Sequence, residues 1–356
     1  MTAPADGYFH RLSRECPTEL FINNPTLAEA EMALQAGAIG ATTNPTYPAR
    51  LLKEEPEYLG RLIDEAVRET DDDNQAADLV YQKAIGRLQK LFHPLYIETQ
   101  GHYGYVAMQG DPRLNTDSAA ILDGAVRYRK LGDNMIIKVP SWPAGAVALE
   151  QMIAMGIPTI GTLGFSIDQA IFMAEAYRRA LQHSQSRPPC HVVFIAGVLD
   201  THLAEVARQA GNPGLVDLIQ YAGSAVNRKV YHVFKSRGYE ARVQGGGARG
   251  PHHFLDLVGG DLSITIGWNL AKQLIETDGP IVSLIDAQTP EATISALEAG
   301  LPDFRKSYQE GSLRPEEFQE FGPVMGFQST FLRGVETLVA AVASTRGAAR
   351  LAESVR

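Results

Sequence analysis

The sequence has few of the features that mark secreted, disulfide-bonded or membrane proteins. Only two of its 356 residues are cysteines, Cys16 and Cys190, and one pair without zinc-type spacing makes neither a disulfide framework nor a zinc site. No run approaches the roughly 18 apolar residues of a membrane-spanning helix. The amino-terminal segment MTAPADGYFHRLSRE lacks the apolar core of a signal peptide. We therefore expect a cytoplasmic protein with reduced thiols and no membrane association.

Basic residues are also in the minority. Lysine and arginine number 32 against 41 aspartates and glutamates, which gives a formal charge of -9. A nucleic-acid surface needs clustered basic residues, so we expect no nucleic-acid partner. A small anionic ligand remains compatible with this charge, because one or two arginines suffice to bind a phosphate.

Short apolar runs alternate with helix-length amphipathic segments through most of the chain. The eight runs are residues 18–23, 39–44, 105–109, 135–140, 159–165, 190–197, 240–246 and 262–267. This alternation predicts repeated βα units with a parallel sheet, and eight strands close a (β/α)8 barrel. A doubly wound open sheet is the alternative, but it needs a glycine-rich turn after the first strand. The first run continues into Asn24-Pro25-Thr26, without glycine, so we predict an α/β fold of the TIM-barrel type.

We assign residues 1–356 to a single barrel domain with two additions. Residues 1–17 form an amino-terminal extension, and residues 280–356 form helices packed on the barrel. Thr26 and Glu29 have the spacing of a capping box, which predicts a helix start. Asp200 is expected to open the helix after the sixth run.

Functional side chains of such barrels lie at the carboxyl ends of the strands and in the following loops. Candidates by this criterion are Asn23, Thr42, Thr43, Asn44, Gln109, Lys138, Thr162, Ser166 and Arg249. Lys138, in the apolar segment MIIKVP, is the most informative of them. Burial lowers the pKa of a lysine, and a neutral amine attacks carbonyl compounds to form Schiff bases. Alternatively, Lys138 extends to solvent or pairs with a carboxylate.

Several segments, in order along the chain, resemble the transaldolase family. They are TTNP (42–45), LFHPLYIETQGHYG (91–104), GYVAMQGDPRLNTD (104–117), IIKVP (136–140), GIPTIGTLGFS (156–166) and LPDFRKSYQEG (301–311). The resemblance covers about residues 18 to 340 and implies a single (β/α)8 barrel. It also implies transfer of a dihydroxyacetone unit between sugar phosphates, without a cofactor or metal.

The resemblance further implies roles for individual residues. Lys138 corresponds to the lysine that forms the Schiff base, and Asn44 to an asparagine that hydrogen-bonds the ketose. Thr162 corresponds to a threonine that holds a catalytic water, and Arg249 to an arginine that contacts phosphate. Thr43 and Ser166 are added as substrate-binding candidates. A homodimer is left open.

Other positions depart from the family pattern. Asn23 stands where the family has a proton-transferring aspartate, and Gln109 where it has a glutamate. Ile160 replaces an asparagine, while Val193 and Val198 replace a serine and an arginine of the phosphate end. An amide keeps hydrogen bonding but cannot act as a general base, a contribution typically worth about 10²- to 10⁴-fold in rate. Replacement bases could come from loops, with Asp111, His102, Tyr103, His252 and His253 as candidates.

Three hypotheses follow. The first is an active Schiff-base enzyme that acts on a ketose, sugar phosphate or hydroxyketone, with an altered substrate or proton-transfer step. The second is a catalytically weakened homologue that binds a sugar or a protein partner. The third is ordinary transaldolase activity, with the matches at Asn23 and Gln109 displaced along their strands. We rank the first highest, because a lysine buried in a barrel is costly without a use.

Overall fold

The computed structural model describes residues 7–354, and within it eight parallel strands form a closed barrel in chain order, β1 to β8. The strands are β1 (Glu19–Asn23), β2 (Gly40–Thr42), β3 (Tyr105–Gln109), β4 (Met135–Pro140), β5 (Thr159–Gly164), β6 (Cys190–Ile195), β7 (Arg242–Gly246) and β8 (Ser263–Ile266). Pairing of β1 with β8 closes the ring. The barrel prediction is confirmed, and the open-sheet alternative is excluded.

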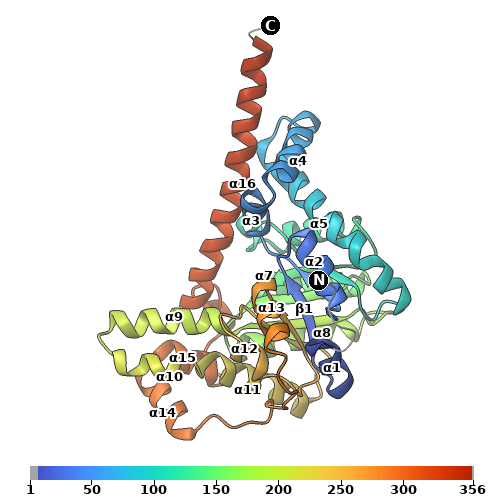
Figure 1. Cartoon of the computed structure of the whole chain (residues 1–356). Coiled ribbons are helices and arrows are strands. Elements are labelled where there is room, and N and C mark those ends of the chain that lie inside the picture. Colours follow the sequence, from blue (N-terminus) through green and yellow to red (C-terminus); the bar gives the residue numbers. More distant parts are fainter. Residues whose placement is uncertain (1–6, 355–356) are drawn as a thin grey trace.

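Helices surround this barrel on its outside (Figure 1). Those up to β5 are α1 (Tyr8–Glu15), α2 (Leu27–Gln35), α3 (Tyr47–Glu54), α4 (Pro56–Glu69), α5 (Asp73–Glu98), α6 (Ser118–Arg129) and α7 (Pro143–Ala154). Those after β5 are α8 (Ile167–Leu181), α9 (Ala196–Gln209), α10 (Val216–Ile219), α11 (Ala222–Arg237), α12 (His252–Leu255), α13 (Trp268–Thr277), α14 (Glu291–Gly300), α15 (Pro302–Tyr308) and α16 (Gly322–Ser354). Short 3₁₀ turns lie at Pro112–Leu114, Pro213–Leu215 and Pro315–Glu317.

The helix starts were predicted with mixed success. Thr26 caps α2 as expected: its hydroxyl accepts from the Glu29 amide at 3.2 Å, and the Glu29 carboxylate accepts from the Thr26 amide at 2.8 Å. The expectation for Asp200 was wrong, because α9 begins at Ala196. The chain passes directly from β6 into this helix, so that Asp200 lies one turn inside it.

Helix α1 and the first part of α16 contact the barrel. Tyr8, Phe9 and Leu12 of α1 are buried, and α1 contacts β1 and α13. Helix α16 runs from the barrel past α3 and α4, and its carboxyl-terminal part projects beyond them (Figure 1). Its Gly334 lies so close to the loop after β2 that an added Cβ would be 2.6 Å from the Pro45 carbonyl oxygen. Within residues 7–354, no helix is long and apolar enough to span a membrane.

Candidate active site

Lys138 is the central side chain at the carboxyl end of the barrel. It lies on β4 and is 8% exposed, and its Nζ donates a hydrogen bond to the Thr43 carbonyl oxygen at 3.2 Å. Across residues 7–354 it has no ion pair. Burial lowers the pKa of Lys138 to about 8. A substantial fraction of the amine is therefore neutral near neutral pH, as a nucleophile requires.

Gln109 lies directly beside Lys138, because the two residues are partners in the β3–β4 register. Its side chain is 1% exposed, and neither Nε2 nor Oε1 has a hydrogen-bond partner in the described chain. Buried amide groups normally have hydrogen-bond partners, so we expect these two atoms to bind water or a ligand. Gln109 can orient such a molecule but cannot take its proton.

Asn23 occupies the carboxyl end of β1. Its Oδ1 accepts from the Thr42 hydroxyl at 3.1 Å, and the Thr42 and Thr265 hydroxyls lie 2.6 Å apart. The one carboxylate of β1 is Glu19, which lies at the opposite end of the strand and pairs with Arg242. Since β3 has no carboxylate, neither strand brings one to the end where Lys138 lies.

A cavity of about 600 Å³ opens at this end of the barrel. Its polar wall includes Asn23, Asn44, Lys138, Thr162 and Arg249. Its apolar wall consists of Val193, Ile195, Val198, Phe327 and Phe331. The strand ends and the β7 loop thus bring together five of the predicted polar residues, Gln109 not among them. Helix α16 supplies two aromatic rings that the sequence motifs did not indicate. Their position could be found only from the packing of the carboxyl-terminal helix over the barrel.

Local backbone structure orients Asn44 and Thr162. The Asn44 Oδ1 accepts from the Thr46 amide at 3.0 Å and from its hydroxyl at 2.6 Å, which leaves the Asn44 NH₂ group for the cavity. Thr162 is followed by Leu163, which has φ of 62°, and the β5–β6 register shifts between Gly161 and Gly164. A non-glycine residue with positive φ is uncommon and often occurs at functional sites. The register shift changes the course of β5 at Thr162.

Thr43 and Ser166, which were predicted to bind substrate, do not line the cavity. The Thr43 hydroxyl donates to the Ala107 carbonyl oxygen at 2.8 Å, so this residue reaches Lys138 only through its own carbonyl. Ser166 is fully buried and caps α8, accepting from the Gln169 amide at 3.1 Å. Both side chains support the elements on which the site is built.

Arg249 lies in the loop after β7 and lines the cavity. No ion pair is found for its guanidinium within residues 7–354. The Nη1 atom instead donates long hydrogen bonds to its neighbours, at 3.4 Å to the Gly247 carbonyl and 3.3 Å to the Ala248 carbonyl. An arginine whose charge is not matched by a carboxylate is available to an anionic group of a ligand.

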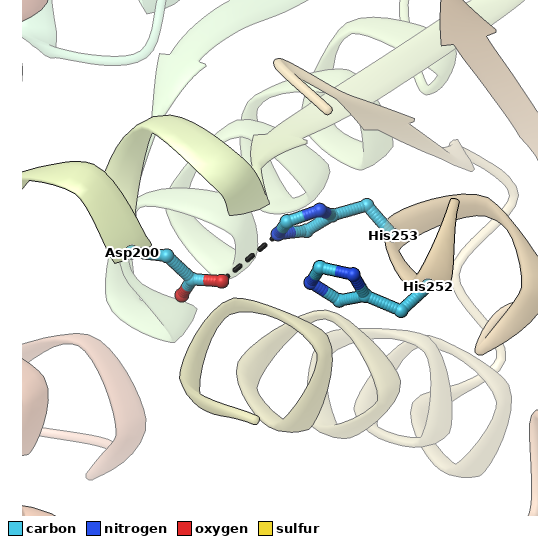
Figure 2. A group of neighbouring side chains, drawn as sticks. All are labelled: Asp200, His252 and His253. Atoms are coloured by element: carbon cyan, nitrogen blue, oxygen red, sulfur yellow. Dashed lines mark hydrogen bonds and ion pairs between the residues drawn. The ribbon is translucent and has the colours of Figure 1, made fainter. Parts of the chain in front are cut away.

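The backbone of Arg249 is held by a buried network that joins α9, α11 and α12, and Figure 2 shows its link between His253 and Asp200. Its N–H donates to His253 Nδ1 at 3.4 Å, and His253 Nε2 donates to Asp200 Oδ2 at 2.9 Å. The other Asp200 oxygen accepts from the Gly223 amide at 2.7 Å. No sequence motif indicated this network, because Asp200, Gly223 and His253 are distant along the chain.

Asp200, His252 and His253 are also metal-ligand types, with one ligand atom of each within 4.8 Å of the others. The His252 and His253 rings lie close together, with centroids 3.9 Å apart and planes tilted by 39° (Figure 2). However, His253 Nδ1 accepts a backbone N–H, which leaves the proton on Nε2, the atom that faces Asp200. The arrangement therefore favours structural support of the β7 loop over metal binding.

The other loop bases are not in the barrel cavity. Asp111 accepts three hydrogen bonds from the Arg113 side chain, at 3.0, 2.9 and 2.5 Å. His102 and Tyr103 precede β3 and so lie at the amino ends of the strands, where Tyr103 borders a separate cavity with Glu19. Among these three residues, none lines the cavity at the Lys138 end.

Comparison with known proteins places this barrel in a family. A family model described as transaldolase/fructose-6-phosphate aldolase matches residues 21–312. A transaldolase from Thiobacillus denitrificans is 35% identical over 156 residues, which cover 43% of each chain. A protein named transaldolase 1 from Streptomyces avermitilis is 30% identical over 214 residues, covering 58% of this chain and 56% of the relative. The matched region thus spans about half the length of these curated relatives. The family model covers most of the barrel, and the chain belongs to the transaldolase/fructose-6-phosphate aldolase family.

Proposed function

We propose that this protein is a transaldolase-type enzyme that forms a Schiff base between Lys138 and a ketose or hydroxyketone, with an altered substrate or proton-transfer step. The observation that carries the proposal is the buried amine of Lys138, which has a hydrogen-bond acceptor but no ion pair across residues 7–354. Membership of the family supports a carbohydrate substrate and transferase or aldolase chemistry.

In this mechanism the neutral Lys138 amine attacks the substrate carbonyl carbon. The first product is a carbinolamine, which loses its hydroxyl group as water to give the imine. The Asn44 NH₂ group and the Thr162 hydroxyl, both on the cavity wall, would hydrogen-bond the substrate and the departing water. Arg249 would hold an anionic group at the far end, where Val193 and Val198 give an apolar wall.

In the proposal, Asn23 and Gln109 do not transfer protons as carboxylates at these two positions would. Both can align a hydroxyl group or water by hydrogen bonds, but neither accepts a proton at neutral pH. Imine formation therefore remains feasible, whereas cleavage of a carbon–carbon bond needs a proton acceptor from elsewhere. The site could thus keep the lysine nucleophile for imine formation and differ from the family in the step after the imine.

The second candidate function is a weakened homologue that binds a sugar or a protein partner. The two amides beside an intact lysine favour it, since loss of two proton-transfer groups reduces turnover. A double substitution, Asn23→Asp with Gln109→Glu, separates the candidates. A gain of about 10²-fold or more in dihydroxyacetone transfer indicates a decayed site, and no gain indicates a site rebuilt for another step.

Borohydride trapping tests the Schiff base itself. The protein is incubated with dihydroxyacetone or another hydroxyketone and reduced, and its intact mass is measured. Lys138→Met should abolish the adduct, while Lys90→Met, at an exposed lysine of α5, should leave it unchanged. Equal labelling of the native protein and Lys138→Met would exclude the proposed nucleophile.

A further inference from the structure

A second cavity approaches Lys138 from outside the barrel. It has a volume of about 550 Å³ and lies between α5 and α6, bordered by the loop after β3 and by the end of β4. Lys138 is the one described residue that lines both this lateral cavity and the barrel cavity. The amine-bearing residue therefore stands between two separate spaces.

One buried amide without a partner lines the lateral cavity, and another lies beside Lys138. Asn115 lines it and is 3% exposed, yet its Nδ2 has no hydrogen-bond partner in the described chain. Its backbone carbonyl, by contrast, is engaged by the Trp142 Nε1–H at 2.8 Å. Gln109, the strand neighbour of Lys138, has two further unpartnered atoms. Such groups normally bind ordered water.

The lateral cavity also carries a carboxylate that can hold a proton. Asp78 lies on its wall and accepts hydrogen bonds from the Tyr128 hydroxyl at 2.8 Å and from Gln82 Nε2 at 2.9 Å. Arg127 is more distant from it, at 3.7 Å. Burial raises the pKa of Asp78. Asp111 lines the same cavity but is bound to Arg113.

We propose that water travels to and from Lys138 through the lateral cavity while substrate is bound in the barrel cavity. Asp78 is the group that holds the proton on that route. The inference rests on the proposed Schiff-base function. In the forward direction the carbinolamine hydroxyl departs with a proton as water. In the reverse direction water adds to the imine carbon, the carbon–nitrogen bond breaks, and the nitrogen takes the proton. A substrate bound in the barrel cavity narrows the direct path between Lys138 and solvent, so a second opening would serve both directions.

The test fills the lateral cavity without touching the barrel cavity. Ala120 of α6 lines the lateral cavity and is partly buried, whereas Ala119 is exposed and does not line it. Ala120→Leu and the matched control Ala119→Leu are mixed with dihydroxyacetone and quenched with borohydride at increasing times. To measure imine decay, the mixture is diluted and then quenched at increasing times. Thermal unfolding of each variant establishes that it is folded.

Ala120→Leu should slow the formation and decay of the imine by a similar factor, severalfold or more, with the equilibrium fraction unchanged. Asp78→Asn should slow both in the same way, and Ala119→Leu neither. Unchanged rates in Ala120→Leu and Asp78→Asn, with imine still formed, would overturn the lateral route alone. Absence of imine in the unaltered protein would overturn the proposed function, and the route with it.

Discussion

At the residue scale, the chemistry of Lys138 depends on what surrounds its amine. Desolvation is the cause of the lowered pKa, about 8, and neither Asn23 nor Gln109 adds a negative charge that would raise it. Imine formation should therefore increase about tenfold between pH 7 and pH 9 and then level off, because the neutral fraction of an amine with a pKa near 8 rises in that range. Initial rates of borohydride trapping across pH 6–10 measure this. A rate that still rises steeply above pH 10 would mean that Lys138 has an ordinary lysine pKa.

The same burial affects stability. Burial lowers the pKa of Lys138 from its ordinary 10.5 to about 8, so the charged form is disfavoured on folding by about 3 kcal/mol. This penalty is fully present below pH 8 and disappears as pH rises to about 10.5. Lys138→Met should therefore raise the free energy of unfolding most at pH 7 and less at pH 10, as measured by urea denaturation. A destabilising effect at pH 7 would show that the amine is better accommodated than its burial indicates.

Sequence reasoning located residues of the candidate site from their places at the strand ends, while their roles stay predictions. Asn23, Asn44, Lys138, Thr162 and Arg249 all line one cavity. It did less well where the direction of the side chain decides the role. The hydroxyl groups of Thr43 and Ser166 turn to the backbone, at the Ala107 carbonyl and the Gln169 amide. That choice depends on three-dimensional neighbours that a linear motif does not specify.

At the scale of the elements, close contact between α7 and β4 fixes the strand that carries Lys138. A Cβ added to Gly145 would lie 1.9 Å from the Pro140 carbonyl oxygen, whereas one added to Gly60 of α4 would meet nothing within 4 Å. Gly145→Ala should therefore lower the melting temperature and reduce imine trapping, because the end of β4 must move. Gly60→Ala should stabilise the protein by about 0.5–1 kcal/mol with trapping unchanged. Thermal denaturation and trapping of the two variants compare them directly, and equal behaviour would contradict this account of the contact.

The strands were predicted closely because each is a short apolar run with turn residues on both sides. Runs 105–109 and 135–140 match β3 and β4 residue for residue. The start of α9 was misplaced because β6 passes into it without a loop, so the polar residue Asp200 was taken for a helix cap. Its carboxylate instead supports the β7 loop through His253, a contact across sequence-distant elements.

At the scale of the whole molecule, the two parts of α16 have different structural roles, which substitutions in each part should distinguish. Its first part places Phe327 and Phe331 at the barrel cavity. Its later part is held by Arg346, which is 7% exposed and donates to Asp73 at 2.7 Å and to the Val67 carbonyl at 3.0 Å.

Arg346→Ala should destabilise the outer half of α16 by about 1–3 kcal/mol, because it removes the hydrogen bonds that the buried, charged guanidinium donates to its half-buried partners. Hydrogen exchange should increase there, while imine trapping stays unchanged. Arg350→Ala is the control, since Arg350 is exposed and only approaches Asp71 at 3.6 Å, and such surface pairs contribute little. Loss of trapping in Arg346→Ala would show that the outer half of α16 and the active site are coupled.

The most direct test of the central claim is to identify the residue that carries the reduced adduct. The unaltered protein is incubated with dihydroxyacetone at pH 8, reduced with borohydride, digested and mapped by mass spectrometry. We predict a single modified lysine, Lys138, in the peptide that contains MIIKVP. An adduct spread over exposed lysines such as Lys90, or no adduct at all, would contradict the account.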